Sequence, residues 1–133
     1  MKIALIGYGK MGQAIEEIAV SKGHEIVLKI NIDNTEDFTP EAIKNADVAI
    51  EFTGPETALD NILKCVEAGV PVVAGSTGWL DAWDQVTEAV KSKNAAFLYS
   101  SNFSIGVNLF FEVNKYLASL MAEYPDYNVA LEE

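Results

Sequence analysis

The sequence lacks arginine altogether and contains one cysteine, Cys65, and one histidine, His24. A single cysteine excludes both a disulfide within the chain and a metal cluster built from several thiolates. No apolar run approaches the roughly 20 residues that a membrane-spanning helix needs, and the start "MKIALIG" is too short to be a secretory signal. A free thiol suits a reducing compartment, so we predict a cytoplasmic protein.

Positive charge is also scarce, because nine lysines stand against twenty acidic residues and the formal net charge is −11. Such a chain repels nucleic acid and anionic membranes at long range, so we expect neither as a partner. An anionic ligand would need nearby lysines or the N-terminus of a helix. The length of 133 residues and the 50% apolar composition, by contrast, suit one domain with a substantial core.

Short apolar runs alternate with stretches that repeat apolar residues at helical spacing. The expected strands cover residues 2–6, 25–32, 47–52, 70–74 and 95–99, and a sixth begins over 127–131. The expected helices cover residues 11–22, a short stretch from 40, 55–68, 81–92 and 107–123. Continuously apolar strands joined by helices predict a parallel sheet covered on both faces, which is a Rossmann-type doubly wound α/β fold in a single domain.

The segment "GYGKMG" stands between the first predicted strand and the first predicted helix. In a dinucleotide-binding loop of this pattern, Gly7 permits the tight turn, Gly9 lets the backbone approach a pyrophosphate, and Gly12 allows close packing of helix on strand. Backbone N–H groups at the start of the helix then meet the anion. A tight turn that binds nothing is the alternative, but three glycines at this spacing exceed what one turn needs.

The end of the second predicted strand, about 20 residues further on, should hold the residue that binds the adenosine ribose. Asn31 and Asp33 both lie at a suitable distance, and the sequence does not separate them. Asp33 would bind a 2′-hydroxyl and repel a 2′-phosphate, whereas Lys10 in the glycine loop would attract that phosphate. We expect use of either NADH or NADPH, with NADH at least as good, because no arginine is present to fork around the phosphate.

Segments rich in glycine, hydroxyls and amides follow the third, fourth and fifth predicted strands, with the sequences "EFTGPET", "VVAGSTGW" and "LYSSNFSIGVN". The carboxyl ends of parallel strands share one edge of the sheet, so these segments should lie on the same rim as the glycine loop. Turn and capping chemistry would explain any one of them, for example Thr53 before Pro55. Three together favour a site for a nicotinamide ribose and carboxamide.

The chain resembles the dihydrodipicolinate reductase family of lysine and diaminopimelate biosynthesis along essentially its whole length, through four motifs in order: "GYGKMG", "EFTGPE", "GSTGW" and "SSNFSIGVN". The last motif is the most specific. Ser76 stands where the family often has threonine, and Lys10 where some members have arginine. The resemblance implies that residues 52–53 line the nicotinamide side, that 75–77 meet the ribose and carboxamide, and that 100–103 close the pocket. The expected cofactor-binding residues are Gly7, Tyr8, Gly9, Lys10, Met11, Gly12, Asn31, Asp33, Phe52, Thr53, Gly75, Ser76, Thr77, Ser100, Ser101, Asn102 and Phe103.

The implied reaction is hydride transfer from NAD(P)H to a cyclic dicarboxylic imine or its hydrated precursor, giving tetrahydrodipicolinate. It needs a proton donor and cations for two carboxylates, which the family supplies from a later motif that opens with a glutamate. The chain stops at Glu133, within or just before that glutamate, and His24 is expected at the opposite edge of the sheet. We therefore expect no catalytic residue and no metal ligand in this chain. We also expect a dinucleotide-binding domain over residues 1–126 and the start of a second, catalytic domain over 127–133.

Assembly and rival functions depend on the same resemblance. The family assembles through the domain expected to be missing, so a homo-oligomer, a tetramer by resemblance, is implied for the longer enzyme, and the dicarboxylate would bind through that domain. A non-catalytic NAD(H)-sensing domain is the alternative function, and it becomes serious only if the natural chain ends at Glu133. A different oxidoreductase or a methyltransferase could share the first loop, but the segment 100–108 argues against both.

Overall fold

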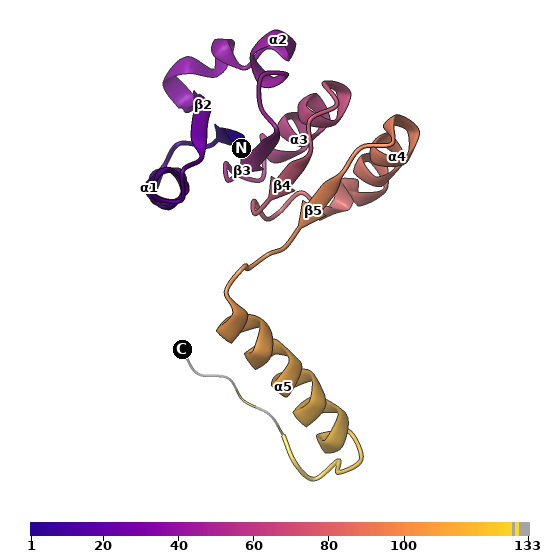
Figure 1. The fold of residues 1–133 in the computed structure, drawn as a ribbon. Coiled ribbons are helices and arrows are strands. Elements are labelled where there is room, and N and C mark those ends of the chain that lie inside the picture. Colours follow the sequence, from indigo (N-terminus) through magenta and orange to yellow (C-terminus); the bar gives the residue numbers. More distant parts are fainter. Residues whose placement is uncertain (129, 131–133) are drawn as a thin grey trace. The chain divides into compact units, whose positions relative to one another are not determined.

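The computed structural model describes residues 1–128 and 130 of the chain. The chain forms two compact units, one over Met1–Ser101 and the other from Asn102 onward (Figure 1). No helix in the described residues is long and apolar enough to cross a membrane.

The first unit is built on a five-stranded parallel sheet. Its strands are β1 (Lys2–Ile6), β2 (Glu25–Ile30), β3 (Val48–Glu51), β4 (Val72–Ala74) and β5 (Phe97–Tyr99). The spatial order is β2-β1-β3-β4-β5, so β1 lies inside the sheet as its continuous apolar run predicts. The doubly wound α/β fold is confirmed, and each of these strands falls inside its predicted range.

Helices connect the strands of this unit. They are α1 (Lys10–Ser21), the short α2 (Pro40–Ile43), α3 (Ala58–Glu67) and α4 (Trp83–Lys93), with 3-10 turns η1 (Ile32–Asp37) and η2 (Leu80–Ala82). Thr39 caps α2, because its Oγ1 accepts a hydrogen bond of 3.2 Å from the N–H of Ala42. Helix α3 begins later than predicted, since the residues after Pro55 first form a turn in which the Ala58 N–H donates to the Gly54 carbonyl.

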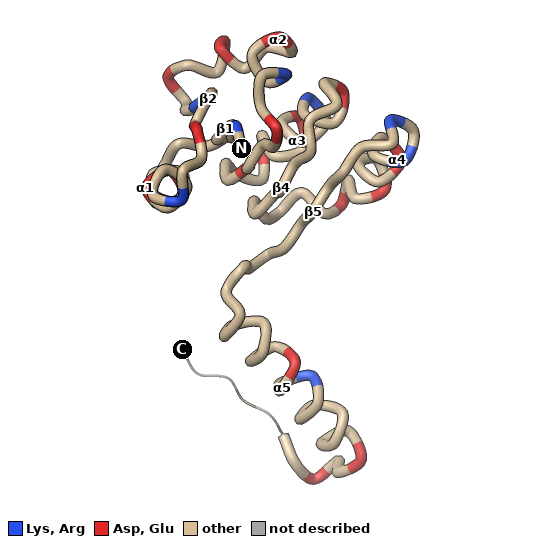
Figure 2. The backbone as a smooth tube through the Cα atoms, in the orientation of Figure 1, with Lys and Arg blue, Asp and Glu red and all other residues tan. Residues whose placement is uncertain are grey.

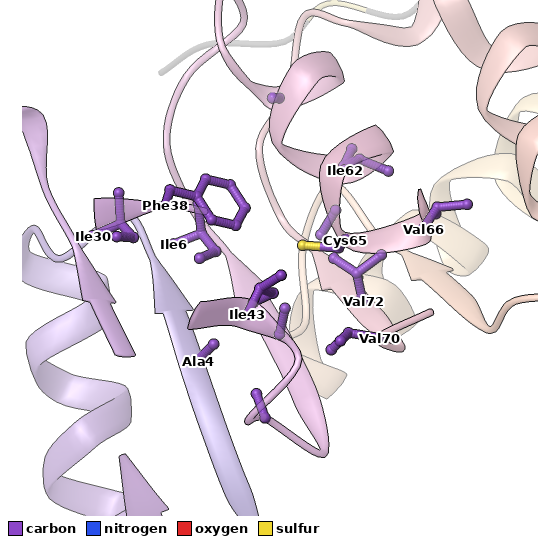
Figure 3. Close-up of a cluster of buried hydrophobic side chains, with 14 of the residues drawn as sticks. Ala4, Ile6, Ile30, Phe38, Ile43, Ile62, Cys65, Val66, Val70 and Val72 are labelled. Carbon is purple, nitrogen blue, oxygen red and sulfur yellow. The ribbon is translucent and has the colours of Figure 1, made fainter. Parts of the chain in front are cut away.

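Buried side chains cover both faces of the sheet at β1, because successive strand residues point to opposite sides. Ala4 and Ile6 belong to the larger apolar cluster (Figure 3), which includes these residues of α3: Ala58, Ile62, Cys65 and Val66. Ile3 and Leu5 form a smaller cluster on the other face with Ala19 of α1. Each large aliphatic side chain buried in this way stabilises the fold by about 1.5–3 kcal/mol, so the sheet positions its loops rigidly.

The second unit contains the helix α5 (Ile105–Met121), close to the predicted range of 107–123. Ser104 caps this helix, since its Oγ accepts a hydrogen bond from the N–H of Val107. The sixth strand expected over 127–131 is not seen at residues 127, 128 and 130, while 129 and 131 lie outside the described residues. The expected start of a second domain at residue 127 stays a prediction.

Candidate nucleotide-binding site

The carboxyl edge of the sheet has a switch point between β1 and β3. The chain passes from β1 through α1 to β2 on one side, and then crosses to β3 on the other side of β1. The loops that follow β1 and β3 therefore diverge, and open α/β sheets bind ligands in the crevice that such a divergence leaves. The predicted residues 7–12 and 52–53 lie in these two loops, and 31–33 follow β2 next to them.

The three glycines of the first loop meet three different geometric demands. Gly7 has a φ of +99°, and a Cβ there would lie 2.0 Å from the carbonyl oxygen of Phe52. A Cβ on Gly12 would lie 2.5 Å from the carbonyl oxygen of Gly7, so helix and loop pack as closely as predicted. A Cβ on Gly9 would meet nothing within 4 Å, which leaves open the space that a pyrophosphate would need.

The start of α1 offers hydrogen-bond donors to an anion. Helical bonding begins with the N–H of Gln13, which donates to the carbonyl of Gly9 at 3.0 Å. The N–H groups of residues 10–12 precede this bond and so have no intrahelical acceptor. The first turn of α1 carries no acidic residue, although acidic positions are spread over the helices and loops of this unit (Figure 2). The helix dipole and these donors together favour a phosphate here.

Tyr8 braces the loop rather than lining the space in front of it. The N–H groups of Gly7 and Tyr8 both donate to the carbonyl of Ile30, at 2.9 and 2.8 Å, which ties the loop to the end of β2. The Tyr8 hydroxyl donates to the Glu16 carboxylate, and this bond raises the pKa of Tyr8 and lowers the pKa of Glu16. Lys29 completes the group, since its Nζ lies 3.4 Å from Glu16 and 4.8 Å from the centre of the Tyr8 ring.

A cavity of about 380 Å³ lies between the loops that follow β1, β2 and β3. Its volume falls in the range of about 300–1,000 Å³ typical of small-molecule sites. Its lining residues are Gly7, Gly9, Ile30, Asn31, Ile32, Thr35, Phe38, Phe52, Thr53, Gly54, Thr57, Asn61 and Lys64. The structure thus brings together parts of three predicted segments, namely 7–12, 31–33 and 52–53.

Asn31 and Asp33, which the sequence leaves as equal candidates, differ in position. Asn31 lines the cavity and Asp33 does not. Asn34 holds this turn in place, because its Oδ1 accepts from the Asn31 N–H at 2.7 Å and its Nδ2 donates to the Lys29 carbonyl at 2.9 Å. Of the two candidates, Asn31 is therefore the one placed to contact a ligand in this cavity.

The cation among the lining residues is Lys64 of α3, not Lys10 of the glycine loop. The Lys64 Nζ lies 5.2 Å from the centre of the Phe38 ring, which also lines the cavity. Lys10 and Met11 are exposed at the start of α1 and do not line it.

The loops after β3 and β4 are held against each other. A Cβ on Gly75 would lie 2.1 Å from the Phe52 ring, so this ring packs directly on the glycine. The Thr53 N–H donates to Ser76 Oγ at 2.7 Å. Ser76 is 6% exposed and Thr77 is exposed, and none of residues 75–77 lines the cavity itself. The segment 75–77 therefore lies behind the loop of Thr53.

The expected pocket-closing segment is divided between the two units. Residues 100 and 101 follow β5 in the first unit, whereas 102 and 103 belong to the second. In the second unit, Asn102 Oδ1 accepts from the Ser104 N–H, and Asn108 Nδ2 donates to the carbonyls of Asn102 and Ser104, each at 2.8 Å. This motif therefore builds the start of α5, and contact of residues 100–103 with a cofactor stays a prediction.

Other reactive or aromatic side chains lie where the sequence suggests structural roles. His24 precedes β2 at the opposite edge of the sheet, as expected. Cys65 is fully buried, and burial raises its pKa to about 12. Trp79 is 4% exposed, donates from Nε1 to the Ser76 carbonyl at 2.8 Å and stacks on Trp83, so it packs in the core beside β5.

Sequence reasoning missed one wall of the cavity. Gly54, Thr57, Asn61 and Lys64 all line it, and their spacing of three, four and three residues is that of one helical face. This spacing is the signal that could have found them. Ile32, Thr35 and Phe38 were hidden in a segment whose polarity predicts only a surface loop, and no pattern in the sequence marks them as lining residues.

The parallel sheet, its switch point and the glycine loop before α1 define a Rossmann-type nucleotide-binding domain. The family model described as "Dihydrodipicolinate reductase, N-terminus" matches residues 1–103, and the chain belongs to this family.

Similarity to individual proteins extends over the chain. The chain is 48% identical over 134 residues to the 4-hydroxy-tetrahydrodipicolinate reductase of Christiangramia forsetii, and the alignment covers 100% of this chain and 55% of the relative. It is 34% identical to the reductase of the same name from Bifidobacterium longum subsp. infantis, covering 93% of this chain and 50% of the relative. A solved structure of dipicolinate-bound dihydrodipicolinate reductase from Paenisporosarcina sp. TG-14 shares the fold, with a TM-score of 0.71, 24% identity and coverage of 93% of this chain and 54% of that chain. The chain thus spans about half the length of these relatives.

Proposed function

We propose that this chain is the cofactor-binding part of a 4-hydroxy-tetrahydrodipicolinate reductase. The reaction is hydride transfer from NADH or NADPH to the cyclic dicarboxylic substrate, giving tetrahydrodipicolinate in lysine and diaminopimelate biosynthesis. Membership of the dihydrodipicolinate reductase family and the names of the relatives support this assignment. A buried free thiol, Cys65, is consistent with a cytoplasmic enzyme.

One observation carries the proposal. The open space at Gly9 adjoins both the N–H groups of residues 10–12, which have no intrahelical acceptor, and the cavity lined by Asn31 and Thr53. A pyrophosphate needs such donors, and a nucleoside needs such a cavity next to them. A loop that served only as a turn would need neither.

The positions of the lining residues give the dinucleotide a direction. Its adenosine half would lie toward Asn31, with Lys64 near a 2′-phosphate when one is present. Its pyrophosphate would lie on the start of α1, and its nicotinamide half would extend past Phe52 and Thr53 toward the loop of Ser76. This direction follows from the order of the loops along the switch point.

The cofactor supplies the hydride when it is bound. The residues of this chain bind its phosphates, orient its two ends and present one face of the nicotinamide to the substrate. His24, the histidine of this chain, lies at the opposite edge of the sheet and so is not placed to protonate a substrate at the carboxyl edge. We propose that protonation and binding of the substrate carboxylates depend on residues beyond this chain, and that assembly into a homo-oligomer does too.

Two measurements test the function. Isothermal titration calorimetry with NADH and NADPH should show binding to the 133-residue chain. A longer enzyme that includes this chain should oxidise NADH when the preceding enzyme of the pathway generates the substrate in place. Nucleotide binding by the chain without turnover by the longer enzyme would favour an NAD(H)-sensing role, and absence of binding would overturn both functions.

A further inference from the structure

Helix α5 carries a wide apolar surface and one narrow polar stripe. Its charged residues are Glu112 and Lys115, which form an ion pair of 2.6 Å (Figure 2). With Asn108 and Ser119 they follow spacings of four, three and four residues, which is one side of a helix. Within the described part of the chain, none of the side chains of α5 is buried. Its large exposed apolar or aromatic side chains are Ile105, Leu109, Phe110, Phe111, Val113, Tyr116, Leu117 and Leu120.

Most of this apolar surface is centred on Val113, the middle residue of α5. Every position within about 80° of Val113 around the helix axis is apolar or aromatic, at 3.6 residues per turn. We refer to these residues as the α5 face: Ile105, Gly106, Leu109, Phe110, Val113, Tyr116, Leu117, Leu120 and Met121. A face this wide is typical of a helix that packs against a partner.

The α5 face is large enough for a protein interface. Apart from Met121, its large side chains are between 48% exposed, at Leu117, and 79% exposed, at Ile105. An aromatic side chain alone buries about 150–250 Å² when it is covered, so the whole face exposes several hundred Å². A contiguous apolar patch above a few hundred Å² marks an interaction site, and about 800 Å² on each partner makes a stable interface.

The charges beside the α5 face argue against a membrane surface as its occupant. Interfacial helices carry many Lys or Arg residues next to their apolar face. The polar stripe of α5 has one lysine, Lys115, which is already paired with Glu112, and the whole chain has a formal net charge of −11. An apolar protein surface therefore fits the α5 face better than an anionic lipid surface does.

The α5 face is complementary to itself. If two copies of α5 pack antiparallel about a two-fold axis at Val113, residues at equal distances before and after Val113 lie level with each other. Leu109 is then level with Leu117, and Gly106 with Leu120. A Cβ on Gly106 would approach no atom of the described chain beyond its own helix closer than 3.8 Å, so Gly106 leaves an open notch for the leucine of the other copy.

We propose that α5 is a self-docking surface through which two copies of this chain pair antiparallel about a two-fold axis at Val113. An interface of this symmetry uses the same patch on both copies, and the α5 face meets that requirement at every level. The polar stripes stay in water at the rim. This pairing of the 133-residue chain is separate from the assembly proposed above for the longer enzyme, which depends on residues beyond this chain.

Sedimentation equilibrium of the 133-residue chain tests the pairing. The chain should have the mass of a dimer at about 0.1 mM and should dissociate on dilution. Val113→Glu should raise the dissociation constant of the dimer by about 100-fold or more, because the two-fold axis brings two like charges together. Val113 is 63% exposed, so each single chain should keep its fold, which circular dichroism checks. Ser119→Glu adds the same charge to the polar stripe and should leave the dissociation constant unchanged.

The measured masses decide between occupants of the face. A chain that is monomeric at about 0.1 mM would overturn the proposal and assign the α5 face to residues beyond this chain. Masses above that of a dimer would indicate open-ended association and would overturn the two-fold arrangement. Equal weakening by Val113→Glu and Ser119→Glu would show that the α5 face is not the interface.

Disulfide cross-linking tests the direction of the pairing. Val113→Cys should give a covalent dimer on oxidation, because helices packed about 8–10 Å apart bring residues on the axis within disulfide reach. Leu109→Cys alone should not cross-link, because its two copies would lie about 12 Å apart along the helices, but a mixture with Leu117→Cys should. Cys65 is fully buried and should not compete. Cross-linking of Leu109→Cys to itself, or none by Val113→Cys, would overturn the proposal.

Discussion

Replacing Gly9 by valine is the sharpest test of the glycine loop, because the structure separates its effect on binding from its effect on folding. The φ of Gly9 is −87°, which other residues adopt freely, and a Cβ there meets nothing within 4 Å. Gly9 is the N-cap residue of α1, and valine is a poorer N-cap, so the folded state should lose about 1 kcal/mol or less. The variant should therefore fold.

The effect on binding should be much larger. The branched side chain of Gly9→Val would fill the space in front of the N–H groups of residues 10–12, and a phosphate would be kept from them. A hydrogen bond to a charged group is worth about 1.5–3 kcal/mol, and about 1.4 kcal/mol corresponds to a tenfold change in affinity. The loss of one such bond should thus lower the affinity for NADH by about 10- to 100-fold.

Isothermal titration calorimetry with NADH measures this loss, and thermal unfolding confirms that the variant is folded. Ala14→Val is the matched control, because it puts the same β-branched residue at an exposed position of α1 away from the loop. The control should bind NADH as the wild type does. If folded Gly9→Val binds NADH with unchanged affinity, the loop is only a turn and the phosphate site assigned here is wrong.

Other expectations concern stability, reactivity, cofactor choice and catalysis. Gly12→Ala should lower the thermal unfolding midpoint, because its Cβ would lie 2.5 Å from the Gly7 oxygen and such overpacking costs about 1–3 kcal/mol; an unchanged midpoint would contradict the close contact. Cys65 should resist iodoacetamide at neutral pH until the chain is unfolded, because it is buried and its pKa is raised to about 12. Rapid labelling of the folded chain, measured by mass spectrometry, would count against this burial. Lys64→Ala should weaken the binding of NADPH more than that of NADH, because Lys64 lines the cavity, and Lys10→Ala should have a smaller effect, because Lys10 does not. If calorimetry finds that Lys64→Ala weakens both cofactors equally, Lys64 does not contact the 2′-phosphate. The 133-residue chain alone should bind NADH without detectable oxidation of it in the substrate-coupled assay, since general acid catalysis contributes about 10²–10⁴-fold, and appreciable turnover would require a proton donor within this chain.

The sheet and the glycine loop could be predicted because local patterns determine both. Each strand of the sheet contains a short apolar run. The requirement for glycine at Gly12 comes from a contact within the loop, and that at Gly7 from a contact with Phe52, just after the neighbouring strand β3. These demands act over short distances or follow from the general order of βαβ units. The same reasoning placed His24 at the opposite edge.

The far wall of the cavity could not be predicted with the same ease, because it depends on how separate segments pack. Asn31 and Asp33 are two residues apart, and only the path of η1 decides which one lines the cavity. Phe38 lies in a polar segment, yet it is buried in the larger core cluster and lines the cavity as well. Glu51 accepts a buried hydrogen bond of 2.9 Å from the Ser76 hydroxyl, although Ser76 is 25 residues away in the sequence.

The central claim is that a nicotinamide dinucleotide binds at the switch point between β1 and β3. A titration of the ¹⁵N-labelled chain with NADH, followed by amide resonances in two-dimensional NMR spectra, tests this most directly. The amides of residues 10–12, Asn31 and Thr53 should shift with one common dissociation constant, while that of His24 at the opposite edge should stay unchanged. Spectra that NADH leaves unaltered, or shifts gathered around His24, would contradict the account.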